Sequence, residues 1–111
     1  MADLSADSAE RIYNSGRKYY ESGKFIEAER DFRQAVSLAP ARGLYQHWLG
    51  RTELILRKYA DAARSFERAS VLDGDLENYL YGAAALEAQG EIDKAKIALQ
   101  EFRRRAAAEG R

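Results

Sequence analysis

Residues 9–42 read AERIYNSGRKYYESGKFIEAERDFRQAVSLAPAR, and residues 43–75 read GLYQHWLGRTELILRKYADAARSFERASVLDGD. Small, aromatic and turn-forming residues recur between these stretches at an offset of 34 positions. The first has Gly16, Ala28, Phe32, Ala35 and Pro40, and the second has Gly50, Ala62, Phe66, Ala69 and Gly74 at the matching positions. A third copy follows at an offset of 33, with Ala83, Ala95, Leu99 and Phe102. A period of this length predicts an array of stacked structural repeats.

Matching turn signals divide each copy into two helices. These signals lie at residues 22–24, 57–58 and 89–91. Abundant Ala, Glu, Arg and Leu with a single proline favour helix over strand. A small residue in each first helix lets two helices cross closely, and Phe32, Phe66 and Leu99 fill the space beside the crossing. We expect Pro40 to separate the first repeat from the second, and Asp75 to cap the fifth helix.

This pattern resembles the tetratricopeptide repeat (TPR) family over nearly the whole chain. The resemblance divides the chain into an N-terminal lead at 1–8, repeats at 9–42, 43–75 and 76–109, and a tail at 110–111. It implies an all-α fold: a single domain that is a right-handed α-solenoid of three helix-turn-helix repeats with six helices. Tyr19 matches the family's aromatic residue late in the first helix, whereas the second copy has Glu53 there.

Length, charge and cysteine content exclude several classes of protein. A chain of 111 residues is enough for one domain with one core. The 18 Lys and Arg residues balance 18 Asp and Glu residues, which argues against a nucleic-acid partner. With no cysteine there is no disulfide and no thiol nucleophile. No apolar stretch is long enough for membrane insertion as a spanning helix. The acidic N-terminal residues lack the basic and apolar regions of a secretory signal, so we expect a cytoplasmic location.

We expect no enzyme activity, no cofactor and no metal site. His47 is the only histidine, and no glycine-rich phosphate loop or nucleophile elbow occurs. Neighbouring carboxylates are predicted to lie on loops or solvated helix faces, where they do not converge as an acid and a base. These are the pairs Asp73 with Asp75 and Glu27 with Glu29.

TPR arrays generally place the first helix of each repeat on a concave surface, which holds a peptide or a helix of a partner. The resemblance implies such a groove here, and its candidate partner-binding residues are Tyr13, Arg17, Tyr20, Leu44, His47, Arg51, Leu80 and Ala84. Arg17 and Arg51 are 34 positions apart, so stacked helices would bring them together to hold a carboxylate. The alternative is that each pairs locally, as Arg17 can with Glu21 four residues later.

Some TPR proteins hold the C-terminal tails of chaperones through a carboxylate clamp of Lys, Asn, Asn, Lys and Arg. The corresponding positions here are Tyr13, Arg17, Trp48, Glu77 and Tyr81, so that clamp is absent. We expect Trp48 and Tyr81 to pack in the core. We expect Tyr13 and Arg17, together with Arg51, to be exposed for contact.

The last predicted helix carries arginine where the earlier second helices carry leucine. Arg105 is in register with Leu38 and Leu72, which predicts a solvated end to the array. Ile97 is in register with outward-facing arginines. Ile97 and Phe102 are therefore a second candidate contact.

The sequence predicts a non-catalytic protein-protein interaction scaffold that binds a peptide or helical segment, acidic and apolar in character, in its groove. The alternative is an assembly subunit that forms a homo-oligomer through its last helix or end to end. A third hypothesis is a secretion-chaperone-like holder of a membrane-inserting protein. That function would need a more apolar groove than Glu10, Glu21 and Glu77 suggest.

Overall fold

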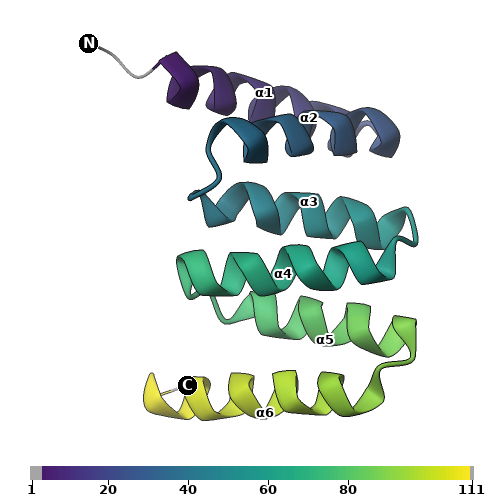
Figure 1. Ribbon diagram of the computed structural model, residues 1–111, viewed down its shortest axis with the longest axis vertical. Coiled ribbons are helices and arrows are strands. Elements are labelled where there is room, and N and C mark those ends of the chain that lie inside the picture. The colour runs from purple at the N-terminus through teal and green to yellow at the C-terminus, as the bar shows by residue number, and fades with distance from the viewer. Residues whose placement is uncertain (1–3, 111) are drawn as a thin grey trace.

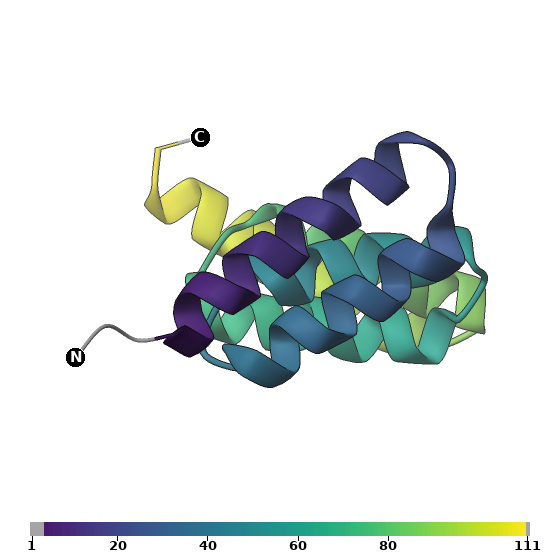
Figure 2. The same cartoon turned by 90° about the horizontal axis from the view of Figure 1, so that it is seen from above.

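The computed structural model describes residues 4–110, which form six helices and no strand. The helices are α1 (Leu4–Glu21), α2 (Phe25–Leu38), α3 (Gly43–Ile55), α4 (Tyr59–Asp73), α5 (Glu77–Gln89) and α6 (Ile92–Ala108). They stack in chain order along the longest axis of a molecule measuring 42 × 32 × 20 Å (Figure 1). Seen from above, α1 and α2 lie side by side and antiparallel (Figure 2). The expected all-α repeat solenoid is confirmed, and α1 begins ahead of the repeat boundary expected at residue 9.

The turns inside the three repeats share one backbone conformation. Gly23 and Gly90 have φ angles of 77° and 90°, and Arg57 has a φ of 63° at the corresponding position. Only glycine adopts this left-handed region without steric cost. Arg57 therefore takes the conformation of glycine while carrying a long side chain.

Glycine is required where the two helices of the first and second repeats cross. A Cβ atom added to Gly16 would lie 2.8 Å from the ring of Phe32, and one added to Gly50 would lie 2.9 Å from the ring of Phe66. Both rings are fully buried. The close crossings predicted from the repeat pattern are therefore present.

The third repeat replaces both members of this pair, with Ala83 for the glycine and Leu99 for the phenylalanine. Ala83 is buried, but Leu99 is only half-buried. Among its described residues α6 has only two buried ones, Ala95 and Ala106. The last helix is consequently the least deeply packed of the six.

Asp75 caps α5 as predicted. The backbone N–H of Glu77 donates a hydrogen bond of 3.0 Å to Asp75 Oδ1. Pro40 lies in the connection between α2 and α3, where it separates the first two repeats.

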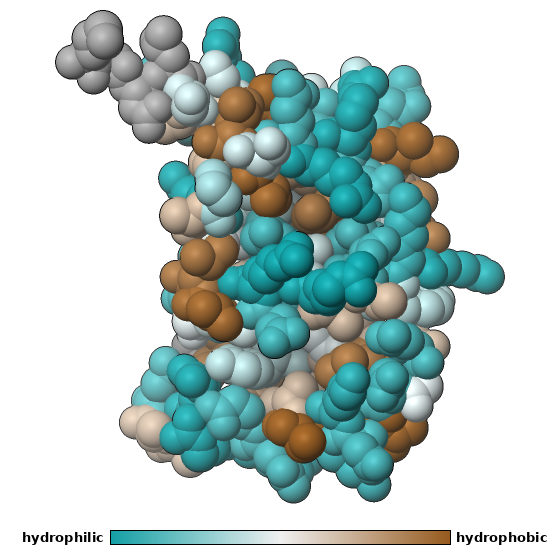
Figure 3. Space-filling model, in the orientation of Figure 1, coloured by the Kyte–Doolittle hydropathy of each residue, from teal (hydrophilic) through white to brown (hydrophobic). Residues whose placement is uncertain are grey.

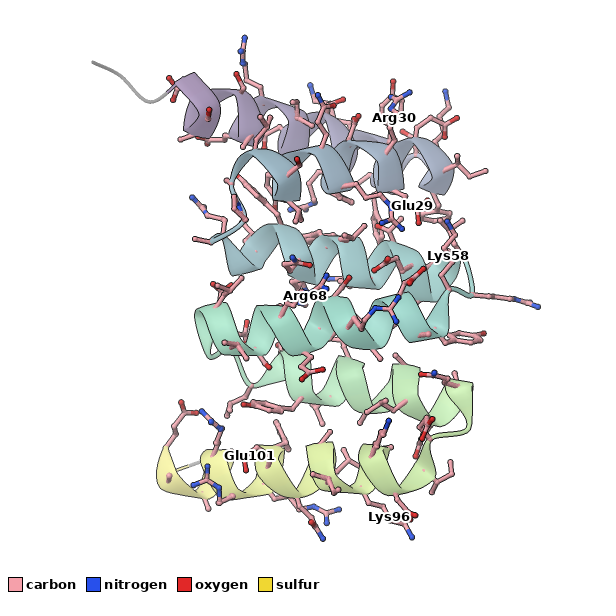
Figure 4. All side chains as sticks on the ribbon, in the orientation of Figure 1. Glu29, Arg30, Lys58, Arg68, Lys96 and Glu101 are labelled. Atoms are coloured by element: carbon pink, nitrogen blue, oxygen red, sulfur yellow. The ribbon has the colours of Figure 1, made fainter. Side chains whose placement is uncertain are left out.

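A network of charges around two buried carboxylates joins α2, α3 and α4 at the junction between the first and second repeats, and we call it the buried charge network. Its members are Glu29, Arg33, Glu53, Lys58 and Ser65. Its two cations, Arg33 and Lys58, are themselves exposed. Ser65 Oγ donates to Glu53 Oε1 at 2.6 Å, and Arg33 Nη2 lies 3.3 Å from Glu53 Oε2. Arg33 also reaches Glu29 at 3.2 Å, and Lys58 Nζ donates to both Glu29 oxygens at 2.9 Å (Figure 4). These contacts fill the position where the family pattern has an aromatic residue.

The two carboxylates of this network have opposite pKa shifts. Burial raises the pKa of Glu53, and the hydrogen bond from Ser65 and the charge of Arg33 only partly oppose this rise. Burial also acts to raise the pKa of Glu29, but hydrogen bonds and charges from Lys58 and Arg33 outweigh it, so that pKa is lowered. The expectation that Glu29 lies on a solvated helix face is wrong. It is 8% exposed because Lys58 and Arg33 supply the partners that make its burial tolerable.

Candidate functional site

The first helices of the three repeats bring together a group of residues that we call the arginine–aromatic cluster. It consists of Arg17 and Tyr20 on α1, Trp48 and Arg51 on α3, and Tyr81 on α5, and all five are half-buried. A spacing of three residues places both members from α1, and both from α3, on the same side of their helix. The rings of Tyr20 and Trp48 meet edge to face, with centroids 5.2 Å apart. We call the surface that α1, α3 and α5 present around this cluster the first-helix face.

Arg51 is at the centre of this cluster. Its guanidinium carbon lies 4.3 Å from the centroid of Trp48, 5.5 Å from that of Tyr81 and 5.7 Å from that of Tyr20. Each of these rings comes from a different helix, and distances below about 6 Å allow a cation–π attraction. Within residues 4–110, Arg51 makes no side-chain hydrogen bond and no ion pair. The rings therefore hold a guanidinium whose charge is not balanced by a neighbouring acid.

Arg17 differs because it already has local partners. Its Nη1 donates to the hydroxyl of Tyr13 at 3.0 Å, and its Nη2 lies 3.5 Å from Glu21 Oε1. The guanidinium carbon lies 3.9 Å from the Trp48 centroid, so it lies within about 8 Å of the guanidinium carbon of Arg51. The local pairing with Glu21 considered from the sequence is thus present. Arg17 Nε is buried and has no partner among the described residues.

His47 lies beside the cluster and is oriented by a residue that the sequence did not indicate. Its Nδ1 donates to Asn78 Oδ1 at 2.8 Å, because an amide oxygen can only accept. Asn78 is 2% exposed, and nothing in the repeat pattern marked it. The imidazole also packs edge to face on Tyr81, with centroids 5.3 Å apart.

Tyr13 is buried, so the expectation that it is exposed for contact is wrong. Its ring lies 6.0 Å from that of Phe32 and 5.0 Å from that of Tyr45. These three residues belong to the first core cluster, which α1, α2 and α3 form; a second core cluster, of Ala62, Phe66 and Ala85, lies between α4 and α5. Only its hydroxyl is directed to Arg17. Trp48 and Tyr81, expected in the core, lie at its edge, each packed against buried residues and in contact with Arg51.

The other candidates on the first helices do not join the cluster. Leu80 and Ala84 line a shallow hollow of about 380 Å³ with Glu77 and Tyr81, and Tyr81 connects this hollow to Arg51. Leu44 is half-buried and packs against the first core cluster.

The two candidates on α6 have different surroundings. Ile97 is 64% exposed and lines a cleft between α4 and α6, whereas Phe102 is half-buried and lies outside that cleft. Arg105, which its register predicts to be solvated, is exposed, as is Arg103 two residues earlier.

Two classes of feature are absent from the part of the chain that the structure covers. No group of three or more His, Asp or Glu side chains is arranged to hold a metal ion there. None of its helices has the length and apolar character needed to cross a membrane.

Comparison with known proteins agrees with this geometry. Residues 9–42 match the family model of the tetratricopeptide repeat, and a comparison with curated proteins found no match. The Arabidopsis OM64 TPR domain is similar in structure, with 18% identity over 88% of this chain and 82% of that chain and a TM-score of 0.82. The second TPR of Spaghetti (RPAP3), bound to the HSP90 peptide SRMEEVD, has 19% identity over 90% and 94% of the two chains and a TM-score of 0.83. The Yersinia enterocolitica type III secretion translocator chaperone SycD has 24% identity over 96% and 81% and a TM-score of 0.84.

The stacked helix pairs define a helical-repeat protein of the solenoid class. With residues 9–42 matching the tetratricopeptide-repeat model, the chain as a whole has the fold of tetratricopeptide-repeat domains.

Proposed function

We propose that the chain is a protein-interaction scaffold that holds a peptide or helical segment of a partner on its first-helix face. Arg51 is the anchor for an acidic side chain of that partner. The hollow formed by Leu80, Ala84 and Tyr81 takes an apolar side chain beside it. The tetratricopeptide-repeat fold is typically a non-catalytic protein-interaction fold, which supports a binding role over a catalytic one.

The observation that carries this proposal is the environment of Arg51. Three rings from three helices position its guanidinium, while no acid within residues 4–110 neutralises it. Arginine and large aromatic residues are the side chains that dominate binding energy at protein interfaces. A carboxylate from a partner would add charge-assisted hydrogen bonds of about 1.5–3 kcal/mol to a guanidinium that is already ordered.

Arg51 therefore has a larger part in this proposal than the pair of arginines predicted from the sequence. Arg17 is engaged by Glu21 and by the Tyr13 hydroxyl, so its charge is partly neutralised. Its stacking on Trp48 supports the ring that holds Arg51.

Structures of similar proteins with bound peptides support a peptide ligand for this chain. TPR domains of Spaghetti (RPAP3) and human RPAP3 are solved with the acidic peptides SRMEEVD and SGPTIEEVD. The carboxylate clamp of chaperone-binding TPR proteins is missing from this sequence. We therefore propose that Arg51 binds an acidic side chain rather than the carboxyl terminus of a chaperone.

The translocator-chaperone role named for SycD is not part of this proposal. Glu10, Glu21 and Glu77 are exposed on the first helices, and a membrane-inserting segment would have to pack against these charges.

Selection of random displayed peptides on the immobilised chain tests the proposal. Selected peptides are expected to share an Asp or Glu close to an apolar residue. Their affinity is expected to fall about tenfold or more for Arg51→Gln, which corresponds to the loss of one charge-assisted contact.

The matched control is Arg68→Gln, which makes the same charge change on α4, outside the first-helix face (Figure 4). This variant should bind the selected peptides as the wild type does. Peptides that bind equally well to the wild type and Arg51→Gln would contradict the proposal.

A further inference from the structure

A cleft separates α4 from α6 at the junction between the second and third repeats, and α5 forms its floor. Its volume is about 500 Å³. Much of its lining is small or apolar and includes Ala60, Ala63, Leu86, Ile97 and Ala98. In Figure 3, pale and brown atoms appear in the band between α4 and α6 on the face toward the viewer.

The repeat register explains why the cleft is open. One repeat further along the chain, the five positions of the buried charge network are occupied by Ala63, Glu67, Leu86, Glu91 and Ala98. Four of these five residues line the cleft, all but Glu91. Ion pairs fill the first junction, whereas the second has smaller or apolar side chains at most of the same positions. The second junction is therefore left unfilled within one copy of the chain.

One side of α6 borders this cleft with a pattern that is complementary to itself. Lys94, Ile97, Ala98 and Glu101 all line the cleft, and their spacing of three, four and seven residues places them on one helix face. The stripe is apolar in its centre and carries opposite charges at its two ends. If a second α6 ran antiparallel about a two-fold axis between residues 97 and 98, Lys94 of each copy would face Glu101 of the other. Ile97 would then face Ala98.

We propose that the cleft and this α6 stripe form a homodimer interface, in which each copy inserts Ile97 into the cleft of the other. Such an interface is isologous, because the same ridge and the same groove are used on both sides. Ile97 is 64% exposed in the single chain and would be covered in the dimer. The interface leaves Arg51 free, so it is independent of the proposed peptide binding.

Charge complementarity favours a second copy as the occupant. Among residues 4–110, the one acidic partner of Lys94 is distant, Glu91 at 3.9 Å. Glu101 contacts Arg104 and Arg105 at 2.6 Å, and these hydrogen bonds lower its pKa to about 2, so it is charged at neutral pH. A carboxylate has further acceptor positions for a lysine from the second copy. Any other protein would have to reproduce the spacing of charges that α6 already carries.

Sedimentation equilibrium of the full chain over a concentration series tests the proposal through charge reversal. The wild type is expected to dimerise. Lys94→Glu would place like charges opposite each other twice in the dimer, so its dissociation constant should rise about tenfold or more. Glu101→Lys should weaken the dimer similarly, and the double variant Lys94→Glu/Glu101→Lys should restore it.

Lys96→Glu is the matched control, because Lys96 projects from α6 away from the stack whereas Glu101 lies on the side toward α5 (Figure 4). It should dimerise as the wild type does, and circular dichroism should show that every variant is folded. A monomeric wild type would overturn the proposal. So would equal weakening by Lys94→Glu and Lys96→Glu, or a double variant no better than the single ones.

A second measurement reports on the interface directly. The chain has no cysteine, so Ile97→Cys introduces a single thiol close to the two-fold axis. A short bis-maleimide should cross-link this variant into a covalent dimer. The Lys96→Cys variant should remain largely monomeric under the same conditions. Equal cross-linking of the two variants would place the contact elsewhere and overturn the proposal.

Discussion

The hydroxyl of Ser65 donates a 2.6 Å hydrogen bond to Glu53 Oε1, and so connects α4 to a carboxylate on α3 that is 2% exposed. Arg33 approaches the other oxygen from α2. One buried acid thus links three helices from two repeats, at a position where the family pattern has an aromatic residue.

The pH dependence of stability should separate the two acids of the buried charge network. Burial raises the pKa of Glu53 in the folded state above the ordinary value of 4.5, so folded protein retains the proton longer than unfolded protein. Its contribution to the free energy of unfolding is therefore largest below pH 4.5 and declines as the pH rises through the folded-state pKa. The wild type should lose stability relative to Glu53→Gln as the pH rises from about 4 to about 7.

Glu29→Gln serves as the comparison, because the wild type should gain stability relative to this variant as the pH rises. The pKa of Glu29 is lowered in the folded state, so its contribution is present above pH 4.5 and is lost as the pH falls through the folded-state pKa. Urea unfolding of the three proteins across the pH range measures both trends. If the stability of the wild type relative to each variant changed with pH in the same direction for Glu53→Gln and Glu29→Gln, the opposite pKa shifts of the two acids would be contradicted.

Arg57→Gly should stabilise the chain. Arg57 has a φ of 63° where the other two repeats have glycine, and a left-handed conformation is unfavourable for residues with a Cβ atom. Relief of this strain, less the greater entropy of glycine in the unfolded chain, should raise the free energy of unfolding by about 0.5–1 kcal/mol. Thermal unfolding measures the change. Gly23→Ala provides the reverse test and should destabilise the chain.

Gly50→Ala should destabilise the second repeat, because its new Cβ atom would lie 2.9 Å from the ring of Phe66. The expected loss is about 1–3 kcal/mol, as for other overpacked cores. Phe66→Leu makes room for the methyl group, in the combination that Ala83 and Leu99 show in the third repeat. The double variant should therefore be more stable than the sum of the single effects implies, and denaturant unfolding of all four proteins gives this coupling. Strict additivity would show that the two positions do not compensate each other.

The HSP90 peptide SRMEEVD should bind no more tightly than the same peptide with an amidated C-terminus. Tyr13 is buried in the core, and Trp48, Glu77 and Tyr81 occupy other positions of the clamp, so no lysine or asparagine is available there to hold the terminal carboxylate. Fluorescence polarisation with the labelled peptide measures this. An affinity that depends on the free C-terminal carboxylate would show that a different set of residues performs the role of the clamp.

The repeat pattern predicts the architecture well because it records contacts within one repeat. Gly16 and Gly50 identified the helix crossings, and Pro40 and Asp75 identified boundaries, since these effects depend on backbone geometry a few residues away. The turn signal at residues 57–58 places Arg57 in a turn but does not by itself indicate its backbone conformation. Its left-handed conformation follows from the register with Gly23 and Gly90, which was available in the sequence.

Contacts between repeats were much harder to predict. The burial of Glu29 depends on Lys58, which is 29 positions away in the sequence. Glutamate and lysine are both typical surface residues, so their types do not predict a buried carboxylate. The pairing of Arg17 with Glu21 follows from their spacing of four residues within one helix. The three rings around Arg51 come from three different helices, so no spacing in the sequence predicts them. The cleft could not be predicted from single residues, because it arises from the loss of a set of partners at matching positions.

The unequal packing of the helices determines the order in which they unfold locally. No residue of α6 belongs to either buried core cluster, so local unfolding should begin at that end and reach α3 last. Amide hydrogen exchange should accordingly be fastest along α6 in dilute solution. If two copies associate through that helix, its exchange should slow as the protein concentration rises, while exchange in α3 should change little.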